Sequence, residues 1–87
     1  MPYIIEKRRF ELNKDMQLET IGNGCNTEGE LNFVLTSILL GYLEKHGIKY
    51  SIFNQIVGAL ECCKLEWYRR KTAIYEEEKI RENGDVY

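Results

Sequence analysis

Apolar residues in the middle of the chain follow the spacing of an α-helix. They recur every three or four positions between residues 28 and 46, which is the spacing of one helix face. Residues 27–28 are placed to cap the start of this helix, and Gly47 is placed to end it in the left-handed conformation. Phe33 and Leu40 form a second apolar line, so we expect this helix to pack on more than one side. The main line consists of Leu31, Val34, Leu35, Ile38, Leu39, Tyr42 and Leu43.

A second, longer helix is predicted from about residue 51 to residue 81, with Ser51 as its N-cap. A continuous helix of that length measures roughly 45 Å, whereas a compact domain of this size is about 30 Å across. The helix would therefore extend beyond its own domain, and a second copy of the chain is expected to cover its surplus apolar residues. The alternative is a bend near residues 72–73. The main line of this helix is Phe53, Ile56, Leu60, Cys63, Trp67, Arg70 and Ile74.

The segment from residue 4 to residue 21 has a less regular pattern. We expect a short helix there with a kink near residues 13–15, followed by a loop rich in glycine and asparagine at residues 22–29. Because 87 residues bury only a small core, oligomerisation is a means of completing it. The sequence thus predicts an all-α fold: a small helical bundle forming a single domain over residues 1–87, completed by oligomerisation.

The cysteines and the single histidine predict neither a stabilising disulfide or metal site nor an enzyme. Cys62 and Cys63 are adjacent and do not form an ordinary loop-closing disulfide, and Cys25 would remain unpaired. His46 lies far from all three in sequence, so we expect no metal site and no cofactor. Whichever of Cys62 and Cys63 faces the core is expected to be a small apolar core residue. The sequence shows no recognisable pairing of a nucleophile with a base, or of an acid with a base, so we expect no catalytic residues and no enzyme.

The apolar stretches are too short for a secretory leader or a membrane span. We therefore expect a protein of a reducing cytoplasm that does not bind membranes.

The pattern that most favours binding is a basic–aromatic cluster in the predicted long helix. Arginine guanidinium groups bind phosphate oxygens in pairs and aromatic rings stack on bases, so the cluster favours a nucleotide-like ligand. The alternative is a solvated helix edge on which Arg69 pairs with Glu66, Glu76 or Glu77. The net charge of −2 disfavours long nucleic acid. The cluster consists of Trp67, Tyr68, Arg69, Arg70, Lys71 and Tyr75, and Arg8 and Arg9 are candidates to lie near it.

Four sequence motifs carry a resemblance to a known family. They are GELNF at residues 29–33, VGALEC at 57–62, EWYRR at 66–70 and YEEEKIRENGDVY at 75–87. On these motifs the chain resembles short uncharacterised proteins of tailed bacteriophages and prophages, although Phe33 replaces a tyrosine, Trp67 precedes Tyr68 and the first segment diverges. The resemblance implies a helical fold, a phage origin and a location in the host cytoplasm.

Two functions follow as hypotheses. Small helical phage proteins include oligomers that sequester nucleotide signals of bacterial immunity, so this chain is expected to bind such a ligand between subunits, as an anti-defence protein. The alternative is a protein–protein adaptor or inhibitor that acts on a host or phage protein without a small ligand. Its anchors would be Trp67, Tyr68 and Arg69.

Overall fold

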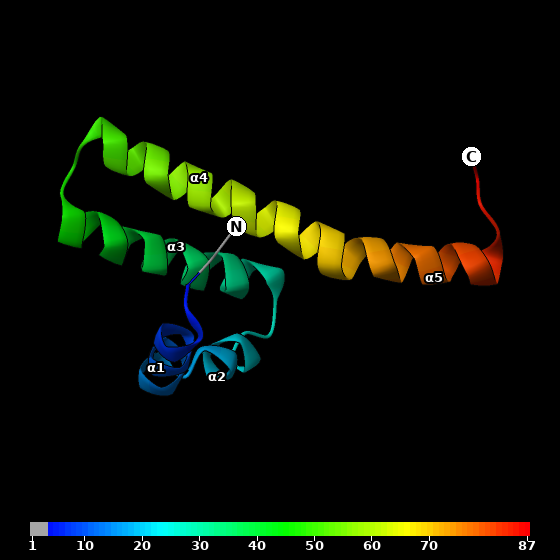
Figure 1. Cartoon of the computed structure of the whole chain (residues 1–87), viewed down its shortest axis with the longest axis horizontal. Coiled ribbons are helices and arrows are strands. Elements are labelled where there is room, and N and C mark those ends of the chain that lie inside the picture. The colour runs from blue at the N-terminus through cyan, green and yellow to red at the C-terminus, as the bar shows by residue number, and fades with distance from the viewer. Residues whose placement is uncertain (1–3) are drawn as a thin grey trace. The chain divides into compact units, whose positions relative to one another are not determined.

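The computed structural model describes residues 4–87, and every regular element in that range is helical (Figure 1). This confirms the predicted all-α class. The chain divides into two compact parts, Met1–Gly41 and Tyr42–Tyr87, which are described separately. The elements are α1 (Glu6–Met16), α2 (Leu18–Asn23), α3 (Glu28–His46), α4 (Tyr50–Trp67), a π-helical turn η1 (Tyr68–Thr72) and α5 (Ala73–Asn83).

The helix of the first segment is broken, as predicted, but the break lies at Gln17. This residue has a left-handed backbone with φ 48° and ψ 56°, and its N–H donates to the carbonyl of Asn13 at 2.8 Å. Residues 13–15, where the kink was predicted, remain within α1. Their polar side chains weaken a helix only slightly, because they are solvated and leave the backbone hydrogen bonds in place.

Both ends of α3 lie where the sequence predicts them. The hydroxyl of Thr27 accepts a hydrogen bond from the Glu30 N–H at 3.1 Å, and the Glu30 carboxylate accepts one from the Asn26 N–H at 2.8 Å. These reciprocal bonds resemble a capping box and satisfy donors that the first turn leaves unpaired. Gly47 follows the helix with φ 92°, so its role as a left-handed cap is confirmed.

The start of α4 differs slightly from the prediction. Lys49 is extended and precedes the helix, and its carbonyl accepts bonds from the N–H groups of Ile52 and Phe53 at 3.0 and 3.1 Å. Lys49 is therefore the N-cap, and Ser51 lies within the first turn. A hydrogen bond of 2.8 Å from the Tyr42 hydroxyl to Gln55 Oε1 joins the end of α3 to α4.

The predicted long helix is confirmed. α4, η1 and α5 follow one another from Tyr50 to Asn83 (Figure 1), a length of about 50 Å at 1.5 Å per residue. The predicted alternative, a bend at residues 72–73, is wrong, because Thr72 and Ala73 both have right-handed helical backbones. The N–H of Ala73 donates to the carbonyl five residues earlier, which is the hydrogen bond of a π-helix.

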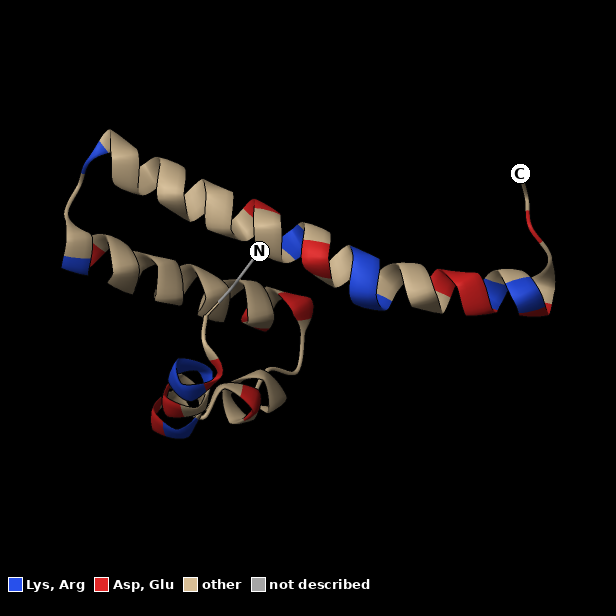
Figure 2. Ribbon diagram, in the orientation of Figure 1, with Lys and Arg blue, Asp and Glu red and all other residues tan. Residues whose placement is uncertain are grey.

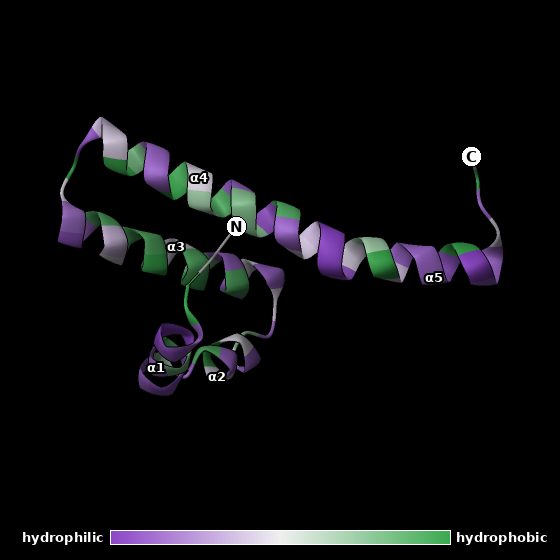
Figure 3. Ribbon diagram, viewed as in Figure 1, coloured by the Kyte–Doolittle hydropathy of each residue, from purple (hydrophilic) through white to green (hydrophobic). Residues whose placement is uncertain are grey.

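Apolar side chains are largely left uncovered. Among residues 4–87 the one buried side chain is Ile52, at 8% exposure, and Figure 3 shows apolar positions along both α3 and α4. No helix among the described residues is both long enough and apolar enough to cross a membrane.

Candidate functional site

The basic–aromatic cluster coincides with the π turn. Trp67 is the last residue of α4, the next four members of the cluster lie on η1, and Tyr75 is on α5. Figure 2 shows a basic band at η1 followed by an acidic band on α5. π turns are rare and are frequent at functional sites. The turn therefore lies in the segment that the sequence analysis predicts to be a binding site.

Arg8 and Arg9 lie on α1, in the other part of the chain. Arg8 forms an ion pair of 3.5 Å with Glu11, one turn along the same helix.

The two arginines of the cluster converge on one carboxylate. Arg69 Nη2 donates a hydrogen bond to Glu66 Oε2, and Arg70 Nε lies 3.8 Å from the same oxygen. The predicted pairing of Arg69 with Glu66 is confirmed. Because these pairs are local and the arginine side chains are about 70% exposed, they compensate charge without contributing much stability. Lys71 is in none of the ion pairs found within residues 4–87.

Tyr68 forms a hydrogen bond across the π turn. Its hydroxyl donates to Glu76 Oε1 at 2.7 Å. In an α-helix, residues eight apart differ by about 80° around the axis, because successive residues turn by about 100°. The extra residue of a π turn reduces that difference, so the two side chains align. The hydrogen bond, the negative charge of Glu76 and slight burial, in that order, raise the pKa of Tyr68 above its ordinary value.

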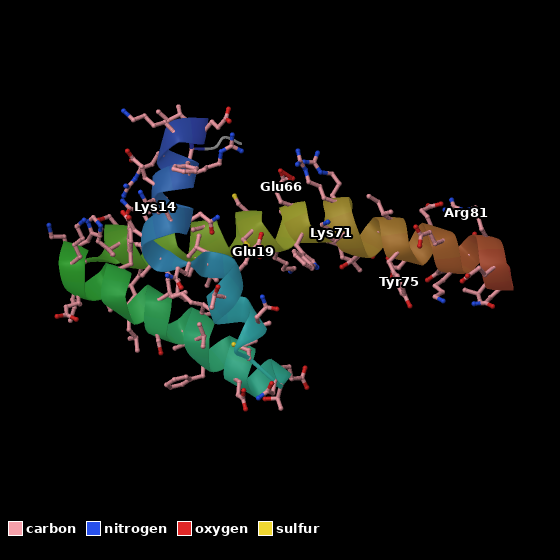
Figure 4. All side chains as sticks on the ribbon, turned by 90° about the horizontal axis from the view of Figure 1, so that it is seen from below. Lys14, Glu19, Glu66, Lys71, Tyr75 and Arg81 are labelled. Atoms are coloured by element: carbon pink, nitrogen blue, oxygen red, sulfur yellow. The ribbon has the colours of Figure 1, made fainter. Side chains whose placement is uncertain are left out.

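A second set of contacts lies on another face of the same helix. Lys79 Nζ lies 5.5 Å from the centre of the Tyr75 ring and 3.1 Å from Glu82 Oε2. Figure 4 shows Tyr75 projecting from the side of the helix opposite Glu66. Trp67 and Tyr75 are 62% and 60% exposed. The Trp67 and Tyr75 rings are thus available for binding, while Arg69 and Arg70 are paired with Glu66.

A surface hollow of about 530 Å³ lies between α5 and the last residues of the chain. Its carboxylates, Glu76 and Asp85, outnumber its single cation, Lys79. A phosphate group placed there would be repelled, because like charges at short range are unfavourable. Sequence reasoning missed Lys79, although its spacing of four residues from Tyr75 was a usable signal. The lining residues are Tyr68, Tyr75, Glu76, Lys79, Ile80, Asn83, Gly84, Asp85, Val86 and Tyr87.

The cysteines differ from one part of the prediction. Cys62 and Cys63 are both exposed, so the expectation that one of them is a core residue is wrong for the single chain. The physical reason is that no side chain of the part Tyr42–Tyr87 covers this stretch of α4. All three cysteines are free, and Cys25 is half-buried, with its thiol 3.5 Å from the Ile21 carbonyl oxygen. No group of His, Cys, Asp and Glu within the described range could hold a metal ion.

Comparisons with known proteins place the chain in a family. No curated protein and no solved structure matches it. The chain belongs to the protein family described as "Domain of unknown function (DUF6899)", whose profile matches residues 1–86.

Proposed function

We propose that this chain is a homo-oligomeric, helical protein–protein adaptor that uses the aromatic rings around η1 as anchors. The observation that carries the proposal is that the aromatic rings of the cluster are exposed while its two arginines are paired with a carboxylate. Arg69 and Arg70 are engaged with Glu66, while the Trp67 ring is exposed. Exposed aromatic residues flanked by polar ones are typical of the energetic centres of protein interfaces.

Exposed apolar side chains support the same proposal. Val57, Leu65, Trp67 and Tyr75 are each more than half exposed. Large apolar patches on soluble proteins are usually sites of association. Covering this surface with protein accounts for the exposure of apolar residues on every long helix.

A nucleotide-like ligand has less support. A phosphate group would compete with the Glu66 carboxylate for both arginines of the cluster. The hollow beside Tyr68 carries an excess of acidic residues. An origin in tailed bacteriophages, supported by the four motifs, is part of the proposal, and a host or phage protein is then the partner of the adaptor.

Two substitutions test the proposal by light scattering. Trp67→Ala should shift the mass toward that of one chain, because it removes an anchor. Leu65→Ala is the matched control: its side chain is also exposed, at 57%, and two positions along a helix place it about 200° from Trp67. It should leave the mass unchanged. Equal effects from both substitutions would contradict the proposal that the oligomer interface lies on the helix face that carries Trp67.

Calorimetry separates the two functions. The adaptor should give no heat with a panel of cyclic and linear nucleotides. Binding heat that Arg70→Ala abolishes, with the oligomer intact, would replace the adaptor by the nucleotide-binding function.

A further inference from the structure

Six residues on one side of the long helix are arranged symmetrically about Ala73. Trp67 and Lys79 lie six positions before and after it. Lys71 and Tyr75 lie two positions before and after, and Lys64 and Glu82 lie nine positions before and after. Each of these three pairs joins a cation to an aromatic ring or to a carboxylate.

These residues share a face, which we call the symmetric face. They are Lys64, Trp67, Lys71, Tyr75, Lys79 and Glu82, and they follow one another in steps of three or four positions. Such steps keep side chains on one side of a helix. The contacts of Lys79 with Tyr75 and Glu82 show this directly at the α5 end.

We propose that a second copy of the chain binds this face in an antiparallel orientation, with a two-fold axis at Ala73. The inference rests on the proposed function, since it names the partner that covers the same aromatic surface. A two-fold interface presents the same patch twice, so a residue before the axis meets the equivalent residue after it on the partner. Each Trp67 therefore meets the partner's Lys79, each Lys71 meets the partner's Tyr75, and each Lys64 meets the partner's Glu82.

Every one of these meetings is attractive. Two are cation–π contacts and one is an ion pair, and the two-fold axis repeats all three. A parallel pair would instead place Lys64, Lys71 and Glu82 against their own copies, where like charges repel. Charge complementarity thus favours an antiparallel second copy over a parallel one, with Lys64 and Glu82 exchanging their exposed intrachain partners, Glu61 and Lys79, for each other.

The dimensions also fit a second copy. The symmetric face spans about 27 Å of helix at 1.5 Å per residue, and antiparallel helices pack along such lengths in bundles. Trp67 and Tyr75 are each more than half exposed in the single chain. Two copies bring four such rings to one interface, and aromatic side chains of this kind dominate interface energies.

Disulfide trapping tests the orientation. The background carries Cys25→Ser, Cys62→Ser and Cys63→Ser, and light scattering first establishes its mass. Thr72→Cys lies one π turn after Trp67 and one residue from the axis, so the two thiols are about 3 Å apart along the helices. We expect most of this variant to form a disulfide-linked dimer under mild oxidation.

Positions far from the axis give the matched control. Lys64→Cys should not link to its own copy, because antiparallel pairing separates the two thiols by about 27 Å along the axis. An equimolar mixture of Lys64→Cys and Glu82→Cys should form linked heterodimers. Circular dichroism confirms that each variant keeps its helix content.

The outcomes distinguish the two proposals. A Lys64→Cys protein that links to itself as well as Thr72→Cys does would show parallel pairing and overturn the inference. A dimeric background with no linkage at any of these sites would place the interface elsewhere, overturning the inference while leaving self-association intact. A monomeric background would overturn the proposed oligomer itself.

Discussion

The Tyr68 hydroxyl donates a 2.7 Å hydrogen bond to Glu76 Oε1, and this bond bridges the π turn between α4 and α5. It is the side-chain link that spans the whole turn within the described residues. It also makes the protonation of a tyrosine matter to the stability of the helix, because a phenolate cannot donate.

The first prediction concerns alkaline pH. The folded-state pKa of Tyr68 is raised above its ordinary value of 10.0, so the bond stabilises the fold below that pH. The contribution is lost as the pH rises through the raised folded-state pKa. The thermal midpoint should therefore fall more steeply above about pH 10 in the natural protein than in Tyr68→Phe.

Tyr75→Phe is the matched control, because the Tyr75 hydroxyl is not part of that bond. It should keep the alkaline fall of the natural protein. Identical slopes for the natural protein and Tyr68→Phe would show that the bond does not form in solution.

Much of the fold was readable from the sequence because local signals agree in α3. Thr27, Glu30 and Gly47 have the residue types that helix ends require, and the apolar spacing between them is regular. The break at Gln17 was displaced from its predicted position because a left-handed glutamine has no distinctive sequence signal. The position of such residues is decided by packing and by the flanking helices.

The candidate site was predicted less completely. The sequence analysis grouped Trp67 with the two arginines because these residues are near neighbours in the sequence. The structure assigns the arginines to Glu66 and places the Tyr75 ring on the other side. A π turn cannot be foreseen from 3.6-residue periodicity, since it adds one residue and shifts every later position.

The second prediction concerns the cap of α3. Thr27→Ala should lower the free energy of unfolding by about 1 kcal/mol, because it removes the hydroxyl that accepts from the Glu30 N–H. Urea unfolding at one protein concentration measures this, since the stability of an oligomer depends on concentration.

Thr36→Ala is the control for this prediction. Its hydroxyl donates to the Asn32 carbonyl within α3 at 2.8 Å and caps nothing, and alanine favours a helix more than threonine does. The change should be neutral or slightly stabilising. A larger loss from Thr36→Ala than from Thr27→Ala would contradict the capping assignment.

The third prediction compares two glycines. Gly47→Ala should destabilise the protein by about 1–2 kcal/mol, because its φ of 92° is unfavourable for any residue with a Cβ. Gly58→Ala, in the interior of α4, should stabilise it by about 0.5–1 kcal/mol. An added Cβ meets nothing within 4 Å at either site, so both effects are conformational. Urea unfolding measures both, and changes of equal sign would contradict this reasoning.

The last prediction concerns the π turn itself. If η1 is an α-helix that contains one extra residue, deleting Arg70 should convert it to an ordinary α turn. The residues before and after the deletion would keep their faces, and only an exposed ion pair would be lost. Circular dichroism should show unchanged helix content, and light scattering should show an unchanged mass.

Deleting Glu77 from the regular helix α5 is the matched control, because it would rotate Lys79 and Glu82 by about 100° away from Tyr75. The dissociation constant of the oligomer should then rise roughly ten-fold or more, which corresponds to about 1.4 kcal/mol. Loss of the oligomer on deletion of Arg70, with the Glu77 deletion tolerated, would mean that the π turn is required for assembly and is not a removable insertion.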